Sequence, residues 1–166
     1  MSATARLCIL ALLALPACAK SGKTSEKTRP RFTVGEPGPG WDRVDPGSAD
    51  RAWFHKGISG SIYGDANCGA RYEDGELADL ARHLGWGIAR GQPERSEALV
   101  LDRREALLQV NEGQLDGVKV KVGLLVTKQD DCLYDLLYIV PPATFEQGWP
   151  DFVQVLQGFQ GRGRTP

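Results

Sequence analysis

A run of ten residues in the last third of the chain constrains the fold most. Aliphatic residues occupy every second position of this run, at Val118, Val120, Val122, Leu124 and Val126. A repeat of two residues is that of a β-strand, whose successive side chains point to opposite faces. The residues between them are mostly polar or small, so we expect a strand over residues 118–127 with one buried face and one face largely in water.

Further strands are predicted on both sides of this run. Residues 132–140 are apolar at nearly every position, which indicates a strand covered on both faces. Pro141-Pro142 is expected to end this strand. Residues 104–112 have good helix propensity, but their alternating apolar residues and the turn-forming Asp116-Gly117 favour a strand. Shorter candidates are residues 41–44, 52–55, 58–63 and 97–101.

Two segments have the apolar spacing of a helix. Residues 77–88 carry one apolar face, with Asp74 as the expected N-cap. Residues 150–159 carry another, with Pro150 in the first turn and a separate turn over residues 145–148. Because short connections join the later strands, we expect an α+β fold: an antiparallel sheet of about six or seven strands with two helices packed on it.

The first residues of the chain predict export. Arg6 precedes a continuous apolar stretch over residues 7–15, which is shorter than the roughly 20 residues of a membrane-spanning helix. Residues 1–17 are therefore expected to be a signal peptide. The polar residues 18–31 would form a disordered tether, residues 32–160 one domain, and residues 161–166 a flexible tail.

The end of the apolar stretch, Leu15-Pro16-Ala17-Cys18, resembles the bacterial lipobox. The resemblance implies cleavage before Cys18, a diacylglycerol on its sulfur and a further acyl chain (palmitate) on its new amino group. Pro16 departs from the pattern, where a small residue is commoner, and an ordinary secretory signal is the alternative. Cys18 is followed by Ala19 and Lys20. Neither is an Asp, which after the lipobox cysteine would resemble an inner-membrane retention signal. An outer-membrane lipoprotein facing the periplasm is thus implied, with the inner membrane as the other location.

The remaining cysteines predict one disulfide. The chain has four cysteines; Cys8 lies in the signal and Cys18 in the lipobox, which leaves Cys68 and Cys132. Exported proteins meet an oxidising compartment, and two cysteines allow a single intramolecular pairing. Such a bridge would stabilise the domain by about 4 kcal/mol in the chain-entropy description.

The sequence carries no recognisable catalytic motif. The chain lacks the phosphate-binding Gly-x-Gly-x-x-Gly and Walker A patterns, and residues 57–61 lack the last glycine of a nucleophile elbow. A zinc site of both cysteines with His55 and His83 would lack any closely spaced ligand pair, so both histidines are expected to be structural. With 20 basic and 21 acidic residues, the net charge of -1 speaks against nucleic-acid binding. We expect no enzyme, no metal and no cofactor.

Asp135 is the most unusual carboxylate, because it lies within the strand that is predicted to be covered on both faces. A buried charge must be paired, hydrogen-bonded or neutralised. The structural interpretation is an ion pair with Arg82 or Arg90 of the helical region. The functional interpretation is a polar anchor in a ligand groove.

Trp86, between Gly85 and Gly87, is the second candidate contact residue. Exposed tryptophans are frequent anchors for partner proteins. The alternative is that Trp86 covers the core where the helix ends.

Taken together, these segments resemble the PsbP-like family, which includes bacterial lipoproteins of the DcrB and LpqN type and the Mog-type proteins. The residues that carry the resemblance are Gly40-Trp41, residues 115–118 and 132–136, Pro141-Pro142 and Gly158-Phe159. The family implies an α/β/α sandwich over residues 32–160, which serves as a binding or accessory module and usually lacks catalytic residues.

The function expected from the sequence is that of a non-catalytic periplasmic module, anchored in the membrane through Cys18 and bound to an envelope protein. The alternative is a lipid or small-molecule carrier with an apolar groove between helix and sheet. An enzyme with an unrecognised site is the third hypothesis, for which the sequence offers no positive feature. Fold alone does not transfer function, so these hypotheses depend on the site.

Overall fold

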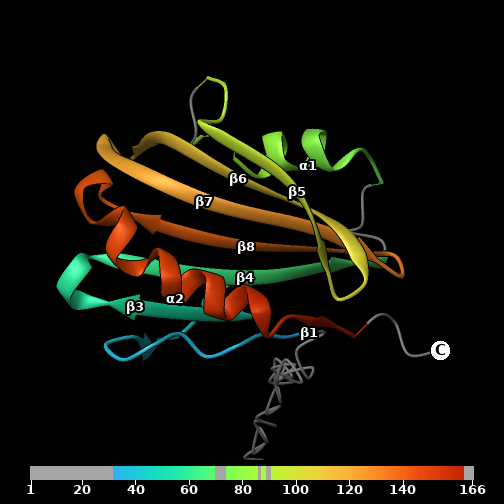
Figure 1. Cartoon of the computed structure of the whole chain (residues 1–166), viewed down its shortest axis with the longest axis horizontal. Coiled ribbons are helices and arrows are strands. Elements are labelled where there is room, and N and C mark those ends of the chain that lie inside the picture. The colour runs from blue at the N-terminus through green and yellow to red at the C-terminus, as the bar shows by residue number, and fades with distance from the viewer. Residues whose placement is uncertain (1–31, 70–73, 86, 89–90, 163–166) are drawn as a thin grey trace, which may run out of the picture.

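A seven-stranded antiparallel sheet forms the centre of the computed structural model, which describes residues 32–69, 74–85, 87–88 and 91–162 (Figure 1). The strand order is β2-β3-β4-β8-β7-β6-β5, so β2 and β5 are the edges. The strands are β2 (Asp42–Arg43), β3 (Arg51–His55), β4 (Gly60–Cys68), β5 (Arg95–Leu101), β6 (Arg104–Leu115), β7 (Val118–Gln129) and β8 (Cys132–Val140). A separate pair joins β1 (Phe32–Thr33) to β9 (Gln160–Gly161). The predicted α+β class is confirmed.

The two helices cover opposite faces of this sheet. Helix α1 (Leu77–Leu84) lies at the half formed by β5, β6 and β7, whereas α2 (Phe145–Gln157) crosses β3, β4 and β8 (Figure 1). Short 3₁₀ turns, η1 (Lys56–Ile58) and η3 (Pro142–Thr144), precede β4 and α2. The arrangement is the expected helix-sheet-helix sandwich, with each helix over a different part of the sheet.

The larger part of the core lies under α2. Phe32, Trp53, Tyr134, Tyr138 and Phe152 are all almost fully buried there. Stacked and edge-to-face ring contacts join several of these side chains, with ring centroids 5.6 Å apart for Tyr138 and Phe152. Closely packed aromatic rings leave little empty space on this side of the sheet.

The expectation of a wet face on β7 is wrong. Gly123, Leu125 and Thr127, on the face predicted to meet water, are buried beneath α2. A Cβ added to Gly123 would lie 2.6 Å from Trp149 Cζ3, so the absence of a side chain at Gly123 lets the tryptophan ring approach the strand. The alternation along β7 correctly predicted that one face of the strand is buried. It did not indicate that α2 covers the other face.

Helix α2 begins earlier than expected. The predicted turn over residues 145–148 is its first turn, because Phe145 and Gly148 are both buried against Tyr138 and its neighbours. Pro150 therefore stands inside the helix, where it removes the N–H that would bond the carbonyl of Glu146.

Helix α1 is shorter than expected and is capped differently. It ends at Leu84 instead of residue 88, and its N-cap is Glu76, without a side-chain cap bond. Asp74 is not the cap, because its carboxylate accepts a hydrogen bond from Lys128 Nζ at 2.8 Å. The helix still buries Leu80 and Ala81 in a small second core with Leu124, Val126 and Leu133.

Strand β4 also begins and ends later than the predicted strand over residues 58–63. Residues 56–58 form η1, capped by His55, whose Nδ1 accepts a hydrogen bond from the N–H of Ile58 at 3.3 Å. The strand therefore starts at Gly60 and continues to Cys68. In the described part of the chain, no helix combines the length and the apolar character needed to cross a bilayer.

Candidate functional site on the open face of the sheet

Helix α1 covers only part of its side of the sheet. It packs on β6 and β7, and its core cluster also takes in Leu133 and Leu137 of β8. The surface formed on the same side by β2, β3, β4 and the remainder of β8 carries no helix of the described chain. We call this surface the open face. Its uncharged members, identified from the strand register, are Val44, Ala52, Phe54, Ser61, Tyr63 and Ile139.

Three large apolar side chains are exposed on the open face. Val44 is 41% exposed, Phe54 39% and Tyr63 37%. In the described chain, these are three of the six large hydrophobic residues that are exposed, and strand pairing groups them on one face around Ala52. Clustered exposed apolar side chains mark interaction surfaces more often than isolated ones do.

A row of three carboxylates borders this apolar surface. Asp65 of β4 lies directly opposite Asp135 of β8. Asp50 stands one residue before β3, and its N–H donates to the carbonyl of Gly64 at 3.0 Å. Like charges on directly opposing strand positions repel one another, so this arrangement is unfavourable to the fold on its own.

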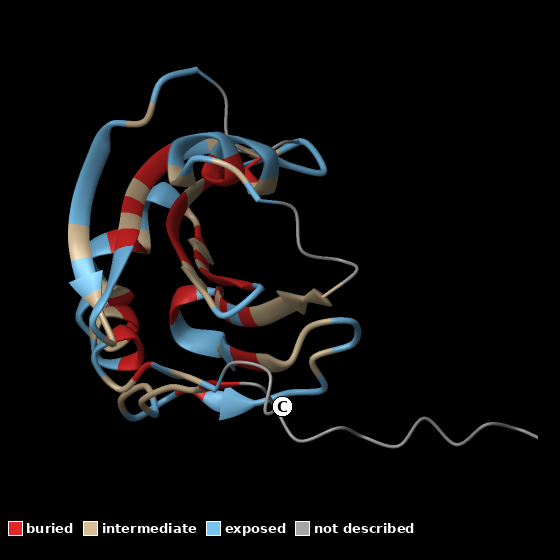
Figure 2. Ribbon diagram, turned by 90° about the vertical axis from the view of Figure 1, so that its right-hand side faces the viewer, coloured by how far each residue is buried: buried red, intermediate tan, exposed pale blue. Residues whose placement is uncertain are grey.

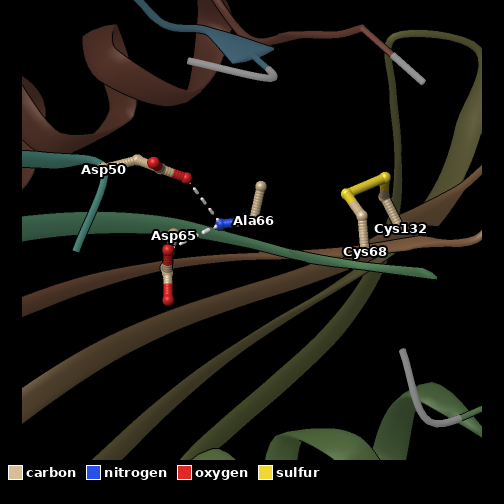
Figure 3. Close-up of a disulfide and its surroundings, with 5 residues drawn as sticks. All are labelled: Asp50, Asp65, Ala66, Cys68 and Cys132. Carbon is tan, nitrogen blue, oxygen red and sulfur yellow. Dashed lines mark hydrogen bonds between the residues drawn. A yellow bond between two sulfur atoms is a disulfide. The ribbon is translucent and has the colours of Figure 1, made fainter. Parts of the chain in front are cut away.

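The Ala66 N–H partly compensates two of these carboxylates. It donates to Asp50 Oδ2 at 3.1 Å and to Asp65 Oδ1 at 2.9 Å (Figure 3). Figure 3 also shows the Asp65 side chain pointing to the side of β4 opposite to the Cys68–Cys132 disulfide. Asp65 therefore projects toward the side of α1, away from the aromatic core.

Asp135 is the least compensated member of the row. Asp135 is only 5% exposed, and its Oδ2 has no hydrogen-bond partner among the described residues. Burial raises the pKa of Asp135 to about 7, and the neighbouring charges of Asp65 and Asp50 act in the same direction. Burial and the charge of Asp65 likewise raise the pKa of Asp50.

The predicted ion pair of Asp135 is not formed with Arg82. Arg82 is exposed on α1 and pairs with Asp79 three residues earlier in the helix. The alternative partner, Arg90, and the candidate contact residue Trp86 lie outside the described residues. The same holds for Cys18, so the lipidation site stays a prediction.

Two hollows lie between α1 and the strands β5 and β6, and both are lined by Ala78. The one at the start of α1 has a volume of about 430 Å³ and is mainly apolar, with Leu77, Ala98, Val100 and Leu107 in its walls. The other, of about 560 Å³, is lined more by polar side chains, among them Arg82, Ser96, Gln109 and Asn111. Strand β5, which forms the outer wall, is mostly exposed (Figure 2).

The remaining predicted residues have structural environments. Cys68 and Cys132 are bonded to each other, as expected, at directly opposing positions of β4 and β8, with their Cα atoms 4.1 Å apart. His55 is structural, as expected, because it caps η1, whereas His83 is exposed on α1 instead of being a structural residue. No three His, Cys, Asp or Glu side chains of the described residues are arranged to hold a metal ion.

Sequence reasoning found Asp135 but missed Asp50, Asp65 and the exposed aromatics of the open face. The alternation of Tyr63 and Asp65 with small or aliphatic residues could have indicated that they share a face. Their meeting with Asp135, however, depends on which strand pairs with β4. That pairing joins residues about 70 positions apart, which no local pattern reveals.

Comparisons with solved structures identify the fold. The structure is similar to LpqN of Mycobacterium tuberculosis, a protein involved in cell envelope biogenesis, with a TM-score of 0.56, 9% identity and coverage of 78% of this chain and 82% of that one. Cyanobacterial PsbP of Synechocystis matches with a TM-score of 0.51, 12% identity and coverage of 74% and 82%. A Pseudomonas aeruginosa protein of unknown function matches with a TM-score of 0.51, 17% identity and coverage of 75% and 83%.

These likenesses show a shared fold at low sequence identity. No family model and no curated protein matches the sequence. Because one fold hosts many functions, the role of the chain must be argued from its own surfaces.

Proposed function

On this PsbP-like fold we propose that the protein is a non-catalytic binding module of the cell envelope, held at a membrane through Cys18. The observation that carries the proposal is the open face, where Val44, Phe54 and Tyr63 expose apolar surface beside a row of carboxylates. The similarity to LpqN, a protein of envelope biogenesis, supports the same setting.

Membrane attachment follows from the lipobox-like sequence at residues 15–18. Each buried methylene contributes about 0.8 kcal/mol, so two or three acyl chains hold far more firmly than the single chain that gives only reversible binding. A module anchored in this way stays at one surface and meets its partner there. We favour the outer membrane, with the domain in the periplasm.

Replacing Cys18 by Ser should release the protein from the membrane. Without the thiol no diacylglycerol can be attached, so the chain should appear in the soluble periplasmic fraction and lose incorporation of labelled palmitate. Cys8→Ser is the matched control, because Cys8 lies in the predicted signal and should not affect lipidation at Cys18. Firm membrane association of Cys18→Ser would contradict the anchor.

Photo-crosslinking in cells tests the binding surface. A photoreactive phenylalanine analogue in place of Phe54 should capture a partner, because this side chain is 39% exposed on the open face. The same analogue at Val118, 62% exposed in the tip between β6 and β7, is the control for accessibility alone. The same analogue is also placed at Tyr63. Equal crosslinking from Phe54 and Val118, or no crosslinking from either Phe54 or Tyr63, would count against a binding role for this face.

A lipid or small-molecule carrier is the second candidate, and the apolar hollow beside α1 favours it. A volume of about 430 Å³ falls in the range of small-ligand pockets. If the hollow holds an apolar molecule, Ala98→Trp should fill it and lower the amount of ligand that mass spectrometry detects with the purified Cys18→Ser chain. Glu97→Trp, on the opposite face of β5, is the matched control. An unchanged ligand content in Ala98→Trp would rule out this hollow.

A further inference from the structure

The charges of the open face all have one sign. Strand register places three acidic side chains on this face: Asp42, Asp65 and Asp135. Asp50, just before β3, lies next to Asp65, because both carboxylates accept the Ala66 N–H. The basic side chains of the same strands, Arg43 and Arg51, fall on the opposite face, where Arg43 pairs with Glu36. A partner that approaches the open face therefore meets carboxylates only from these strands.

Among the described residues, these carboxylates have no ion-pair partner. Within the described chain, none of the four forms a salt bridge within 4.0 Å, and Asp135 Oδ2 is buried without any hydrogen-bond partner. Lys128 of β7 points to the same side of the sheet but binds the Asp74 carboxylate and the Gly75 carbonyl. The acidic row is thus available to a cation from outside.

The charge also decides between possible occupants of the face. Two copies of the chain that met through this surface would place the same carboxylates against one another, which is repulsive. A nucleic acid or an anionic lipid surface would be repelled for the same reason. A protein segment with both apolar and basic side chains is attracted by the aromatics and by the carboxylates together.

We infer that the open face binds a basic amphipathic segment of a partner protein, whose apolar side chains rest on Val44, Phe54 and Tyr63 while its Lys or Arg side chains meet Asp42, Asp50 and Asp65. This inference rests on the proposed binding function and adds the chemistry of the partner. Helix-in-groove recognition uses the same combination of an apolar stripe and flanking charges. Asp135 lies beside Asp65, on the neighbouring strand β8, and is almost fully buried.

Binding of a defined peptide tests the inference on the purified Cys18→Ser chain. The probe is a leucine-lysine peptide patterned as an amphipathic helix of about five turns, and its counterpart carries glutamate at every lysine position. We expect the basic peptide to bind and to shift the amide NMR signals of Phe54 and Tyr63. Its affinity should fall as the salt concentration rises. The acidic peptide should not bind. Equal binding of both peptides, or shifts confined to the hollows beside α1, would overturn the inference.

Removal of charge provides the matched variants. The double variant Asp42→Asn/Asp65→Asn should lower the affinity for the basic peptide by about tenfold or more, and a tenfold loss corresponds to about 1.4 kcal/mol. Glu112→Gln/Asp116→Asn removes two exposed charges near the tip between β6 and β7, where the peptide is not expected to bind. Unfolding midpoints show whether each variant is folded, and Asn at residue 65 keeps an oxygen that can accept the Ala66 N–H. Equal affinities of the two double variants would refute the inference.

Crosslinking in cells separates this inference from the proposed function. If crosslinks from the Phe54 position disappear in Asp42→Asn/Asp65→Asn and map to a Lys- or Arg-containing segment of the captured protein, both stand. If the crosslinks persist in that variant, the binding module survives and the basic partner does not. If neither Phe54 nor Tyr63 yields a specific crosslink, both fail.

Discussion

Asp135→Asn is expected to stabilise the protein at about pH 8 and to remove most of the decline in stability between about pH 4 and pH 7. The reason is the difference between the pKa of Asp135 in the folded chain, about 7, and its ordinary value of 3.8. In that interval the folded protein keeps a proton that the unfolded chain releases. The contribution of Asp135 to the free energy of unfolding is therefore most favourable at low pH and falls as the pH rises toward 7.

The size of this effect follows from the same pKa values. One pKa unit corresponds to about 1.4 kcal/mol, so the penalty at about pH 8 amounts to at most about 4 kcal/mol. The charges that act on Asp135 are Asp65, directly opposite on β4, and Asp50, just before β3. From β7 it faces the apolar Val126, and the nearby Lys128 is bound to Asp74.

Denaturant unfolding at about pH 5 and about pH 8 measures this prediction. The wild-type free energy of unfolding should be lower at the higher pH, whereas Asp135→Asn should show a smaller difference. Asp116→Asn, an exposed change of the same chemistry, should keep the wild-type difference. A decline in Asp135→Asn as steep as that of the wild type would show that another group causes it.

Loss of the disulfide is expected to have an effect of similar size and opposite sign. Cys68 and Cys132 are separated by 64 residues, so the bridge restricts a large loop in the unfolded chain. Cys68→Ala/Cys132→Ala should lower the free energy of unfolding by about 4 kcal/mol in the chain-entropy description. Alanine is chosen because Cys132 is fully buried, where a serine hydroxyl would add its own penalty.

Reduced wild-type protein provides the control for this comparison. In the presence of a reductant, its unfolding midpoint should approach that of the double alanine variant. Alkylation of the non-reduced, processed chain should detect no free thiol, since Cys68 and Cys132 are joined. Equal unfolding midpoints of oxidised wild type and variant would mean that the bridge contributes nothing measurable to stability.

The sequence predicted the strands well where their pattern was strong, as in β7 and β8. It also placed residues 104–112 in a strand despite their helix propensity, because alternation and the following turn outweighed that propensity. Its errors arose where another element decides the outcome. Gly123 is buried under Trp149 and Phe152 of α2, and Phe145, where α2 starts, is buried beside Tyr138.

The candidate site was predictable only in part, for the same physical reason. Asp135 was conspicuous as a carboxylate in an apolar strand, but its surroundings depend on its register with Asp65 and on the position of α1 over β6 and β7. The aromatics Phe54 and Tyr63 are ordinary strand residues by pattern. They are exposed because no helix of the described residues covers that half of the face, which is a property of the whole arrangement.

The pairing of β1 with β9 places the two ends of the domain next to each other, with Phe32 opposite Gly161. Phe32 is fully buried and packs on Phe159, with ring centroids 6.0 Å apart, so both ends are held by the same aromatic contacts. Residues 32 and 161 could accordingly be joined by a short linker and the chain reopened at the Asp116-Gly117 turn. Such a circular permutant would keep every strand neighbour of the sheet. The element that follows the predicted signal peptide, however, would be a different one.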